Sequence, residues 1–191
     1  MAVTVKICGV RDLETADFAL AAGADWVGLV LAPTRRRVDW DTAEAIVRSH
    51  PGRIIAVVRD VPDALFQRLW TLPWGGLQVY DRPFADWVPP ARARGWLTVR
   101  PGRCEADRDG AEVLLLEPAE PGQGRRLDWR ELAVPARPFW LAGGLTPDNV
   151  REALAWLEPD GVDVSSGVER NGEKDRGLIR RFIEEVKSWR G

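Results

Sequence analysis

The feature that most constrains the fold is the alternation of short apolar runs with more polar segments along the whole chain. Eight of these runs have the length and composition of strands buried on both faces, which is typical of a parallel sheet covered by helices. The expected strands are residues 3–8, 26–31, 53–58, 77–80, 96–99, 111–116, 139–142 and 161–164. Eight strands that alternate with helices predict an α/β protein with the architecture of a (β/α)8 TIM barrel.

The length of 191 residues suits a single domain that spans residues 1–191. It is short for this kind of barrel, which usually needs at least about 200 residues. We therefore expect shortened helices around strands 5 and 6. Residues 84–94 are interrupted by Trp and Pro, and residues 103–109 supply few residues for a helix. Other helices are expected after Asp12, after Asp39 or Asp41, after Pro62, from residue 128, over residues 147–156 and, as a closing amphipathic helix, over residues 174–189.

Charge and cysteine content exclude several classes of protein. The formal net charge of −2 argues against nucleic acid as the main partner. No apolar run is long enough to span a bilayer, and the first residues enter a strand directly, so we expect neither a membrane segment nor a signal peptide. The two cysteines, Cys8 and Cys104, are too few for a disulfide framework. These observations together predict a cytoplasmic protein.

Two late strand ends are rich in small residues and predict a phosphate site. Residues 141–145 read Leu-Ala-Gly-Gly-Leu, and residues 163–169 read Asp-Val-Ser-Ser-Gly-Val-Glu. Small residues allow backbone N–H groups to approach an anion closely. In (β/α)8 enzymes a phosphate often binds in the loops after strands 7 and 8. A doubly wound sheet is the competing fold, but Gly9 belongs to no G-x-G-x-x-G turn, and the phosphate-like turns come late in the chain.

The C-terminal ends of the expected strands carry a small set of polar side chains that could perform chemistry. They are Cys8, Arg35 to Arg37, Gln78, Asp81, Glu117, Asp163, Ser165 and Ser166. A thiol and a carboxylate above a phosphate cradle suggest proton transfers on a sugar phosphate without a cofactor. The single histidine, His50, is expected at the opposite end, which leaves no Ser-His-Asp triad and no histidine-rich metal site.

Each of these residues also has a simpler explanation when it is taken alone. Cys8 could be a small buried apolar residue, and the arginine run could be solvated surface. Glu117 could be a surface residue that precedes a proline. The combination of residues, and their positions at strand ends, carries the catalytic interpretation.

A series of motifs resembles one known family. The segments are 6–9 (K-I-C-G), 34–38 (T-R-R-R-V), Gln78, 122–124 followed by 128–129, 141–145 with Pro147, Asn149 and Val150, and 163–169 (D-V-S-S-G-V-E) with Lys174 and Asp175. In this order they resemble phosphoribosylanthranilate isomerase of tryptophan biosynthesis. The matches run from Lys6 to Asp175 and therefore cover nearly the whole chain.

The resemblance implies an Amadori rearrangement in a (β/α)8 barrel. The substrate would be N-(5-phosphoribosyl)anthranilate, a phosphorylated aminosugar, and the product 1-(2-carboxyphenylamino)-1-deoxyribulose 5-phosphate. It implies general acid–base catalysis with no cofactor and no metal, in a monomer or a homodimer. By motif position, Cys8 would be the base, Glu117 the acid, and Arg36 the partner of the anthranilate carboxylate. Further substrate-binding positions would be Gln78, Gly143, Gly144, Asp163, Ser165, Ser166 and Gly167, most of them around the phosphate, with Asp163 facing the ribose.

Three departures from the family pattern bear on this assignment. The family's acid is an Asp, whereas this chain has Glu117, which is longer by one methylene group. The family's Q-L-H-G is Gln78-Val79-Tyr80-Asp81 here, and its G-V-F is Ala56-Val57-Val58. A glutamate over apolar barrel walls is expected to have a raised pKa, as an acid at neutral pH requires.

The departures keep other hypotheses open. One alternative is a barrel that binds a phosphosugar without turnover or with altered specificity. Another is a different sugar-phosphate isomerase or epimerase on the same scaffold. Acceptance of the related aminoaldose of histidine biosynthesis is a further open possibility.

Overall fold

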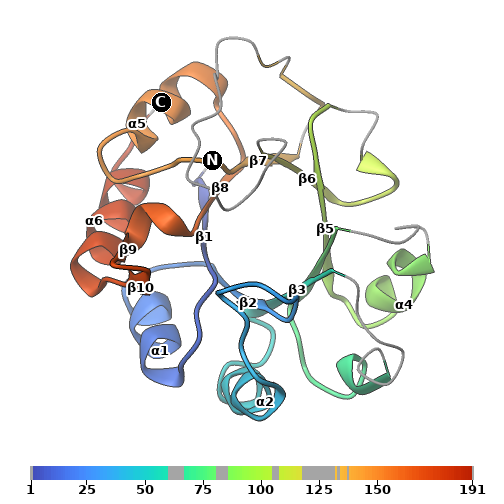
Figure 1. Cartoon of the computed structure of the whole chain (residues 1–191). Coiled ribbons are helices and arrows are strands. Elements are labelled where there is room, and N and C mark those ends of the chain that lie inside the picture. Colours follow the sequence, from blue (N-terminus) through green and yellow to red (C-terminus); the bar gives the residue numbers. More distant parts are fainter. Residues whose placement is uncertain are drawn as a thin grey trace.

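The computed structural model describes residues 2–59, 67–80, 86–104, 108–117, 132, 134–136 and 138–190. Its centre is a closed barrel of eight parallel strands that follow one another in chain order, with the last paired to the first (Figure 1). The strands are β1 (Thr4–Cys8), β2 (Trp26–Val30), β3 (Ile54–Val58), β4 (Gly76–Val79), β5 (Leu97–Gly102), β6 (Val113–Leu116), β7 (Phe139–Leu141) and β8 (Gly161–Val164). Each predicted strand overlaps an observed one, and the predicted barrel is confirmed.

Helices cover the outside of the barrel. Those with described bounds are α1 (Leu13–Ala21), α2 (Trp40–Ser49), α4 (Val88–Arg92), α5 (Val150–Leu157) and α6 (Arg176–Lys187). Three of them begin after an aspartate, namely Asp12, Asp39 and Asp175, whose carboxylate accepts a hydrogen bond from the backbone N–H three residues later. Such a cap satisfies one of the N–H groups that a helix leaves unpaired at its start. The predicted start at Asp12 is confirmed, and Asp39 is the cap of α2.

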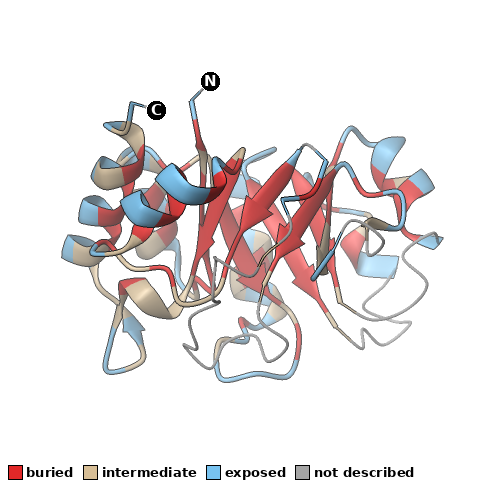
Figure 2. Cartoon of the chain, turned by 90° about the horizontal axis from the view of Figure 1, so that it is seen from above, coloured by how far each residue is buried: buried red, intermediate tan, exposed pale blue. Residues whose placement is uncertain are grey.

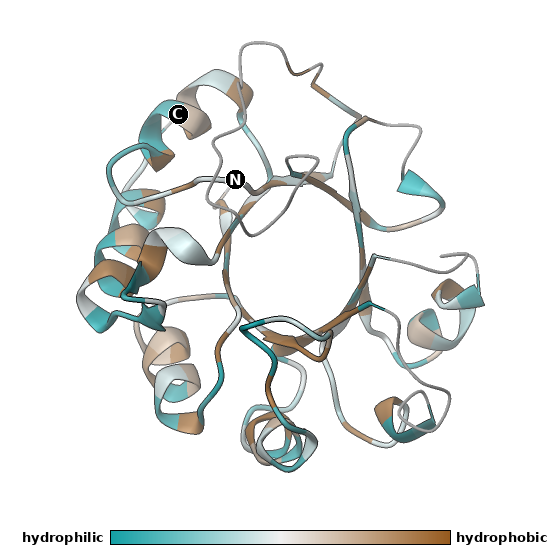
Figure 3. Ribbon diagram, viewed as in Figure 1, coloured by the Kyte–Doolittle hydropathy of each residue, from teal (hydrophilic) through white to brown (hydrophobic). Residues whose placement is uncertain are grey.

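The apolar core has two layers that follow from the alternation of side chains along each strand. Outward-facing side chains pack against the helices, and a second cluster fills the barrel itself. That inner cluster consists of Cys8, Val30, Ala32, Ile55, Val57, Val99, Val113, Leu115, Trp140 and Ala142. The strands are almost entirely buried (Figure 2), and apolar residues follow the barrel wall (Figure 3). Trp140 is accommodated because Gly161 lies beside it, and a Cβ at Gly161 would come within 2.6 Å of the indole.

The closing helix begins later than the sequence indicates. The prediction placed its start at residue 174, but α6 begins at Arg176. Before it, β9 (Glu169–Arg170) and β10 (Glu173–Lys174) form a short antiparallel hairpin. Asn171 and Gly172 form the turn and both have positive φ, as hairpin turns of this kind require. The hairpin therefore turns residues 173 and 174 back toward the barrel.

One helix is shorter than predicted, and several expectations fall outside the described residues. The helix expected over residues 84–94 is reduced to α4, in line with the expected shortening before strand 5. Most of the segment after Pro62, part of residues 103–109, the start at residue 128 and Asp81 lie outside the described residues. His50 follows α2 and precedes β3, at the end of the barrel where strands begin, as predicted. Within the described ranges, no helix has both the length and the apolar character needed to cross a bilayer.

Candidate active site

The predicted functional residues gather at the end of the barrel where the strands terminate, which we call the mouth. Cys8 is the last residue of β1, Gln78 and Asp163 lie near the ends of β4 and β8, and Glu117 directly follows β6. Parallel strands that close into a barrel bring their C-terminal ends to one rim. Residues separated by more than one hundred positions in the chain therefore face one another there.

Lys6 links two of these residues across the barrel. Its Nζ donates to Gln78 Oε1 at 2.7 Å and to Asp163 Oδ2 at 2.9 Å. The Lys6 side chain is completely buried. Burial alone would lower the pKa of Lys6, but the charge of Asp163, with a further contribution from Cys8, raises it above the ordinary value. Asp163 Oδ1 is buried and has no hydrogen-bond partner among the described residues, so it can accept a substrate hydroxyl.

Glu117 lies beside Tyr80, a residue that the sequence did not single out for chemistry. The Tyr80 hydroxyl donates to Glu117 Oε2 at 3.0 Å and accepts from Gln78 Nε2 at 3.0 Å. Burial raises the pKa of Glu117 to about 7 even though the Tyr80 hydrogen bond acts in the opposite direction. A carboxyl with this pKa is substantially protonated at neutral pH. The predicted raised pKa is confirmed in direction and in cause.

Cys8 lies in a space left by the neighbouring strand. A Cβ on Gly28, its partner in β2, would come within 2.9 Å of both Cys8 Sγ and Lys6 Cε. Burial raises the pKa of the Cys8 thiol, while the cations Lys6 and Lys174 act to lower it. The effect of these two cations is smaller than that of burial, to which the charge of Asp163 adds. The thiol of the resting site is therefore protonated at neutral pH.

The loops after β7 and β8 form the glycine-rich region for which the sequence predicts a phosphate site. Gly143 and Gly144 both have positive φ, and Asn149 holds their turn by donating from Nδ2 to the Gly144 carbonyl at 2.9 Å. Gly167 lies so close to the β7 loop that a Cβ there would come within 1.7 Å of the carbonyl oxygen of Leu145. The two loops thus meet backbone to backbone. Ser166 starts the short 3-10 helix that contains Gly167.

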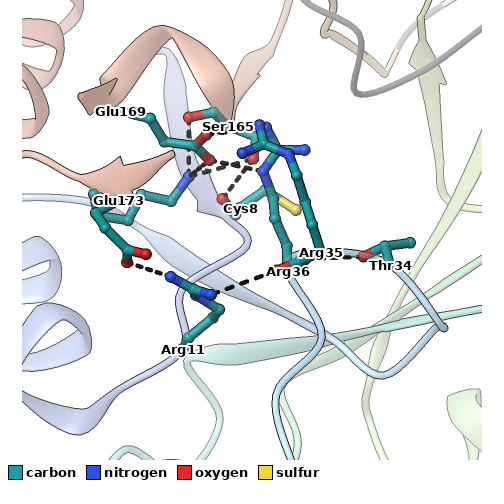
Figure 4. Close-up of polar contacts among 9 residues, drawn as sticks. Cys8, Arg11, Thr34, Arg35, Arg36, Ser165, Glu169 and Glu173 are labelled. Carbon is teal, nitrogen blue, oxygen red and sulfur yellow. Dashed lines mark hydrogen bonds and ion pairs between the residues drawn. The ribbon is translucent and has the colours of Figure 1, made fainter. Parts of the chain in front are cut away.

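Ser165 connects this region to the ends of the first strand and the hairpin. Its hydroxyl donates to the carbonyl of Cys8 at 3.0 Å. Lys174, from β10, donates to the Ser165 carbonyl at 2.9 Å and to the carboxylate of Glu169 at 2.9 Å. Figure 4 shows Ser165, Glu169 and Cys8 close to one another. A buried cation therefore lies beside the small-residue loop, in a position suited to an anionic ligand.

Arg36 is the innermost of the three consecutive arginines. Its Nε and Nη2 form a two-pronged ion pair with Glu169, at 2.7 and 3.1 Å (Figure 4). Burial alone would raise the pKa of Glu169, but Arg36 and Lys174 outweigh burial and hold it at about 2. The Arg36 side chain is 11% exposed, whereas that of Arg35, which also pairs with Glu169, is 55% exposed. Arg37 is exposed and its backbone forms a bridge with Val30, so Arg36 is the least exposed of the three arginines.

Comparison with known proteins gives the family. A model of the N-(5'-phosphoribosyl)anthranilate isomerase family matches residues 100–185. An enzyme of this name from Desulforudis audaxviator is 42% identical over 196 residues, which cover 94% of this chain and 96% of the relative. The chain belongs to the phosphoribosylanthranilate isomerase family. Its barrel is correspondingly similar to the solved structure of the Thermus thermophilus isomerase, with a TM-score of 0.80, 31% identity, and coverage of 98% of this chain and 100% of the other.

A second solved structure bears on the ligand of the family. A phosphoribosylanthranilate isomerase in complex with reduced 1-(o-carboxyphenylamino)-1-deoxyribulose 5-phosphate has a TM-score of 0.75 and 29% identity to this chain, over 98% of this chain and 100% of the other. As a member of this family, the protein is an isomerase of tryptophan biosynthesis. Among the residues that the structure describes, no group of His, Cys, Asp and Glu could hold a metal ion.

Four residues at the mouth were not recognised from the sequence as candidate functional side chains. Lys6 and Lys174 were used only as motif positions, and Tyr80 only as a departure from the family pattern. Glu169 was used only as the end of its motif. Lys6 carried the clearest signal, because a charged residue inside a strand buried on both faces requires a partner.

Proposed function

We propose that the isomerase reaction of this chain uses Glu117 as the general acid and Cys8 as the general base, on N-(5'-phosphoribosyl)anthranilate held at the mouth. The observation that carries this proposal is the position of the Glu117 carboxyl. It follows β6 at the rim, beside Tyr80, and its pKa of about 7 allows it to donate a proton at neutral pH. Cys8 and Asp163 both lie close enough to Tyr80 for their charges to raise its pKa.

Three parts of the mouth would bind the substrate. The loops with Gly143, Gly144, Ser166 and Gly167 would hold the phosphate through backbone N–H groups, with Lys174 nearby. Arg36 would bind the anthranilate carboxylate, because Glu169 takes only the Nε edge of the guanidinium. Asp163 would accept a ribose hydroxyl through Oδ1, while Lys6 fixes Oδ2, and Gln78 completes that side of the site.

The proton transfers then follow in order. Glu117 donates its proton to the furanose ring oxygen, the bond from that oxygen to C1 breaks, and the nitrogen lone pair forms the C1=N bond of a protonated Schiff base. The Cys8 thiolate removes the proton from C2. The C–H electron pair forms the C1=C2 bond, and the C1=N π pair returns to nitrogen. The enolamine that results loses the proton of its C2 hydroxyl and gains one at C1, which gives the aminoketose.

The two pKa values determine the protonation states of the resting site. Below pH about 7 both Glu117 and Cys8 carry their protons, and above the raised pKa of Cys8 neither does. Between these limits Glu117 and Cys8 together hold one proton. In the form that can react, the proton is on Glu117 and Cys8 is a thiolate. Lys6 and Lys174 favour that thiolate. The positive charge of the Schiff base formed in the first step favours it further.

A fluorescence progress curve tests this function, because the aminobenzoate group of the product differs in fluorescence from that of the substrate. We expect turnover by the wild-type protein and loss of most activity in Cys8→Ser, since a serine hydroxyl is too weak an acid to furnish a base near neutral pH. Cys104→Ser is the matched control, because Cys104 is exposed and lies after β5. Near-normal turnover in Cys8→Ser would contradict the thiolate base. Binding without turnover in the wild type would favour a phosphosugar-binding barrel.

We propose that residues 1–191 form a single domain that acts in the cytoplasm as a monomer or a homodimer, without a nucleic-acid partner or a cofactor. Whether the aminoaldose of histidine biosynthesis is also a substrate is decided by the same fluorescence experiment with that compound in competition.

A further inference from the structure

We propose that Tyr80 is a positioning residue for the reaction. Its hydroxyl orients the Glu117 carboxyl and stabilises the carboxylate that forms when Glu117 gives up its proton. The proposal rests on the assignment of Glu117 as the acid. Two of the positions at which this chain departs from the family pattern, Tyr80 and Glu117, contact each other across the mouth at 3.0 Å.

The direction of the hydrogen bonds fixes what the Tyr80 hydroxyl does. Lys6 Nζ donates to Gln78 Oε1, and Gln78 Nε2 in turn donates to the Tyr80 oxygen. Because that oxygen already accepts a hydrogen bond, its own hydrogen is directed to Glu117 Oε2. A buried cation thus begins a polarised chain of hydrogen bonds that ends at the acid. In this proposal, Glu117 Oε1 carries the proton that is given to the substrate.

The surroundings hold Tyr80 in this orientation. The Arg59 guanidinium lies 4.6 Å from the centre of the Tyr80 ring, a cation–π distance. Arg100, from β5, donates to the carbonyl oxygens of Val79 and Tyr80 at 3.0 and 3.1 Å. Burial, together with the charge of Glu117, raises the pKa of Tyr80 well above its ordinary value, so the hydroxyl keeps its hydrogen throughout the working pH range.

The charged groups around Glu117 come from several strands. Lys6 and Arg59 lower its pKa, and Asp163 raises it. Arg100 contacts the backbone beside Tyr80. Of all these groups, Tyr80 is the one with a hydrogen bond to the Glu117 carboxyl among the described residues. A hydrogen bond donated to a carboxyl favours its ionised form, so loss of this bond raises the pKa of Glu117.

The contact also explains how a longer acid serves at this position. A glutamate has one more rotatable bond than an aspartate and would lose the geometry that proton transfer needs. A hydrogen bond to one carboxyl oxygen restricts that extra freedom. The tyrosine at position 80 therefore supplies the restraint that the shorter family acid does not require.

The first experiment measures the pKa of Glu117 in the resting protein by 13C NMR of labelled glutamate side chains, with Glu117→Gln used for assignment. Tyr80→Phe keeps the ring over Arg59 and removes the hydroxyl. We expect the Glu117 midpoint to rise by about one pH unit, the scale of one hydrogen bond to a charged group. The rising limb of the profile of kcat/KM against pH should move upward by the same amount.

The matched control is Thr98→Val. Thr98 Oγ1 donates to the carboxylate of Glu112 at 3.0 Å, between the starts of β5 and β6 at the opposite end of the barrel. This variant also removes a hydroxyl bonded to a carboxylate, but it should leave the Glu117 midpoint and the pH profile unchanged. A shift equal to that of Tyr80→Phe would show a general effect of barrel stability and would overturn the proposal.

Fluorotyrosine offers a test that does not depend on how Tyr80→Phe folds. Tyr80 is the single tyrosine of the chain, so incorporation labels this position alone. Fluorination makes the hydroxyl a stronger donor, and we expect the Glu117 midpoint to fall, opposite to the effect of Tyr80→Phe. An unmoved midpoint in both proteins would overturn the proposal.

A double-mutant comparison separates this proposal from the assignment of the acid. Tyr80→Phe should lower kcat about tenfold in the wild-type background, but less than about twofold in the Glu117→Gln background, where the shared function is already lost. Full turnover in Glu117→Gln alone would refute the acid assignment and the positioning role together. An inactive Glu117→Gln with an unmoved Glu117 midpoint in Tyr80→Phe would refute only the role of Tyr80.

Discussion

Glu169 shows how a single residue can order the proposed substrate site. Its carboxylate binds Arg36 in a two-pronged arrangement and also binds Lys174. These contacts hold the Glu169 pKa at about 2, so the carboxylate remains charged at any working pH. Arg36 is therefore held in place before the proposed contact with the substrate carboxylate forms, which would lower the entropy lost on binding.

The role of Arg36 can be tested by comparison with its neighbour. Arg36→Ala should raise KM at least about tenfold, the scale of a charge-assisted hydrogen bond, and change kcat much less. The substrate carboxylate lies far from the reacting carbons, so its binding is similar in the ground and transition states. Arg35→Ala is the control, because Arg35 contacts the same carboxylate but is far more exposed. A larger effect at Arg35 or Arg37 would show that the substrate contacts a different arginine.

At the scale of elements, the loops after β7 and β8 act as one unit because their backbones touch. Gly167 allows this approach, and Asn149 holds the Gly143–Gly144 turn from the start of α5. The hairpin of β9 and β10 then carries Glu169 and Lys174 back over the same loops. The proposed phosphate site is thus built from backbone geometry more than from side chains.

Gly167→Ala tests this unit. The added Cβ would lie 1.7 Å from the Leu145 carbonyl oxygen, so the two loops must separate. We expect a loss of at least about 2 kcal/mol in the free energy of unfolding, together with a raised KM. Gly110→Ala is the control. It has positive φ but meets no atom within 4 Å, so it should cost about 1 kcal/mol through backbone strain and leave KM unchanged. An unchanged KM in Gly167→Ala would contradict the phosphate assignment.

The elements of this fold were more predictable from the sequence than the contacts between them. The eight strands were predictable because burial on both faces leaves an unbroken apolar run in each. The hairpin of β9 and β10 was missed, although Asn171-Gly172 is a strong turn signal, because its flanking residues are charged and lack an apolar alternation. The bond between Tyr80 and Glu117 joins different strands, and no local pattern encodes it.

At the scale of the whole molecule, the proposed acid Glu117 should reduce the stability of the fold near neutral pH. The folded pKa of Glu117 is about 7, above its ordinary value of 4.5. Between these two pH values the folded protein binds a proton that the unfolded chain does not bind. The free energy of unfolding therefore falls as pH rises through this interval, by at most about 3 kcal/mol from this group.

Glu117→Gln removes this dependence. Denaturant unfolding at pH 4.5 should give similar stabilities for the variant and the wild type. At pH 8 the variant should be more stable, because the neutral amide has no buried charge to desolvate. A variant that loses stability equally at both pH values would show that Glu117 is ionised and well solvated in the folded protein.

The most direct test of the central claim is the kcat of Glu117→Gln, measured from the fluorescence progress curve under saturating substrate. The amide preserves the shape of the side chain and cannot transfer a proton. We predict a loss of at least about a hundredfold, the usual scale for one general acid, with KM little changed. Full turnover in this variant would contradict the account and would move the acid role to Asp163 or Asp81.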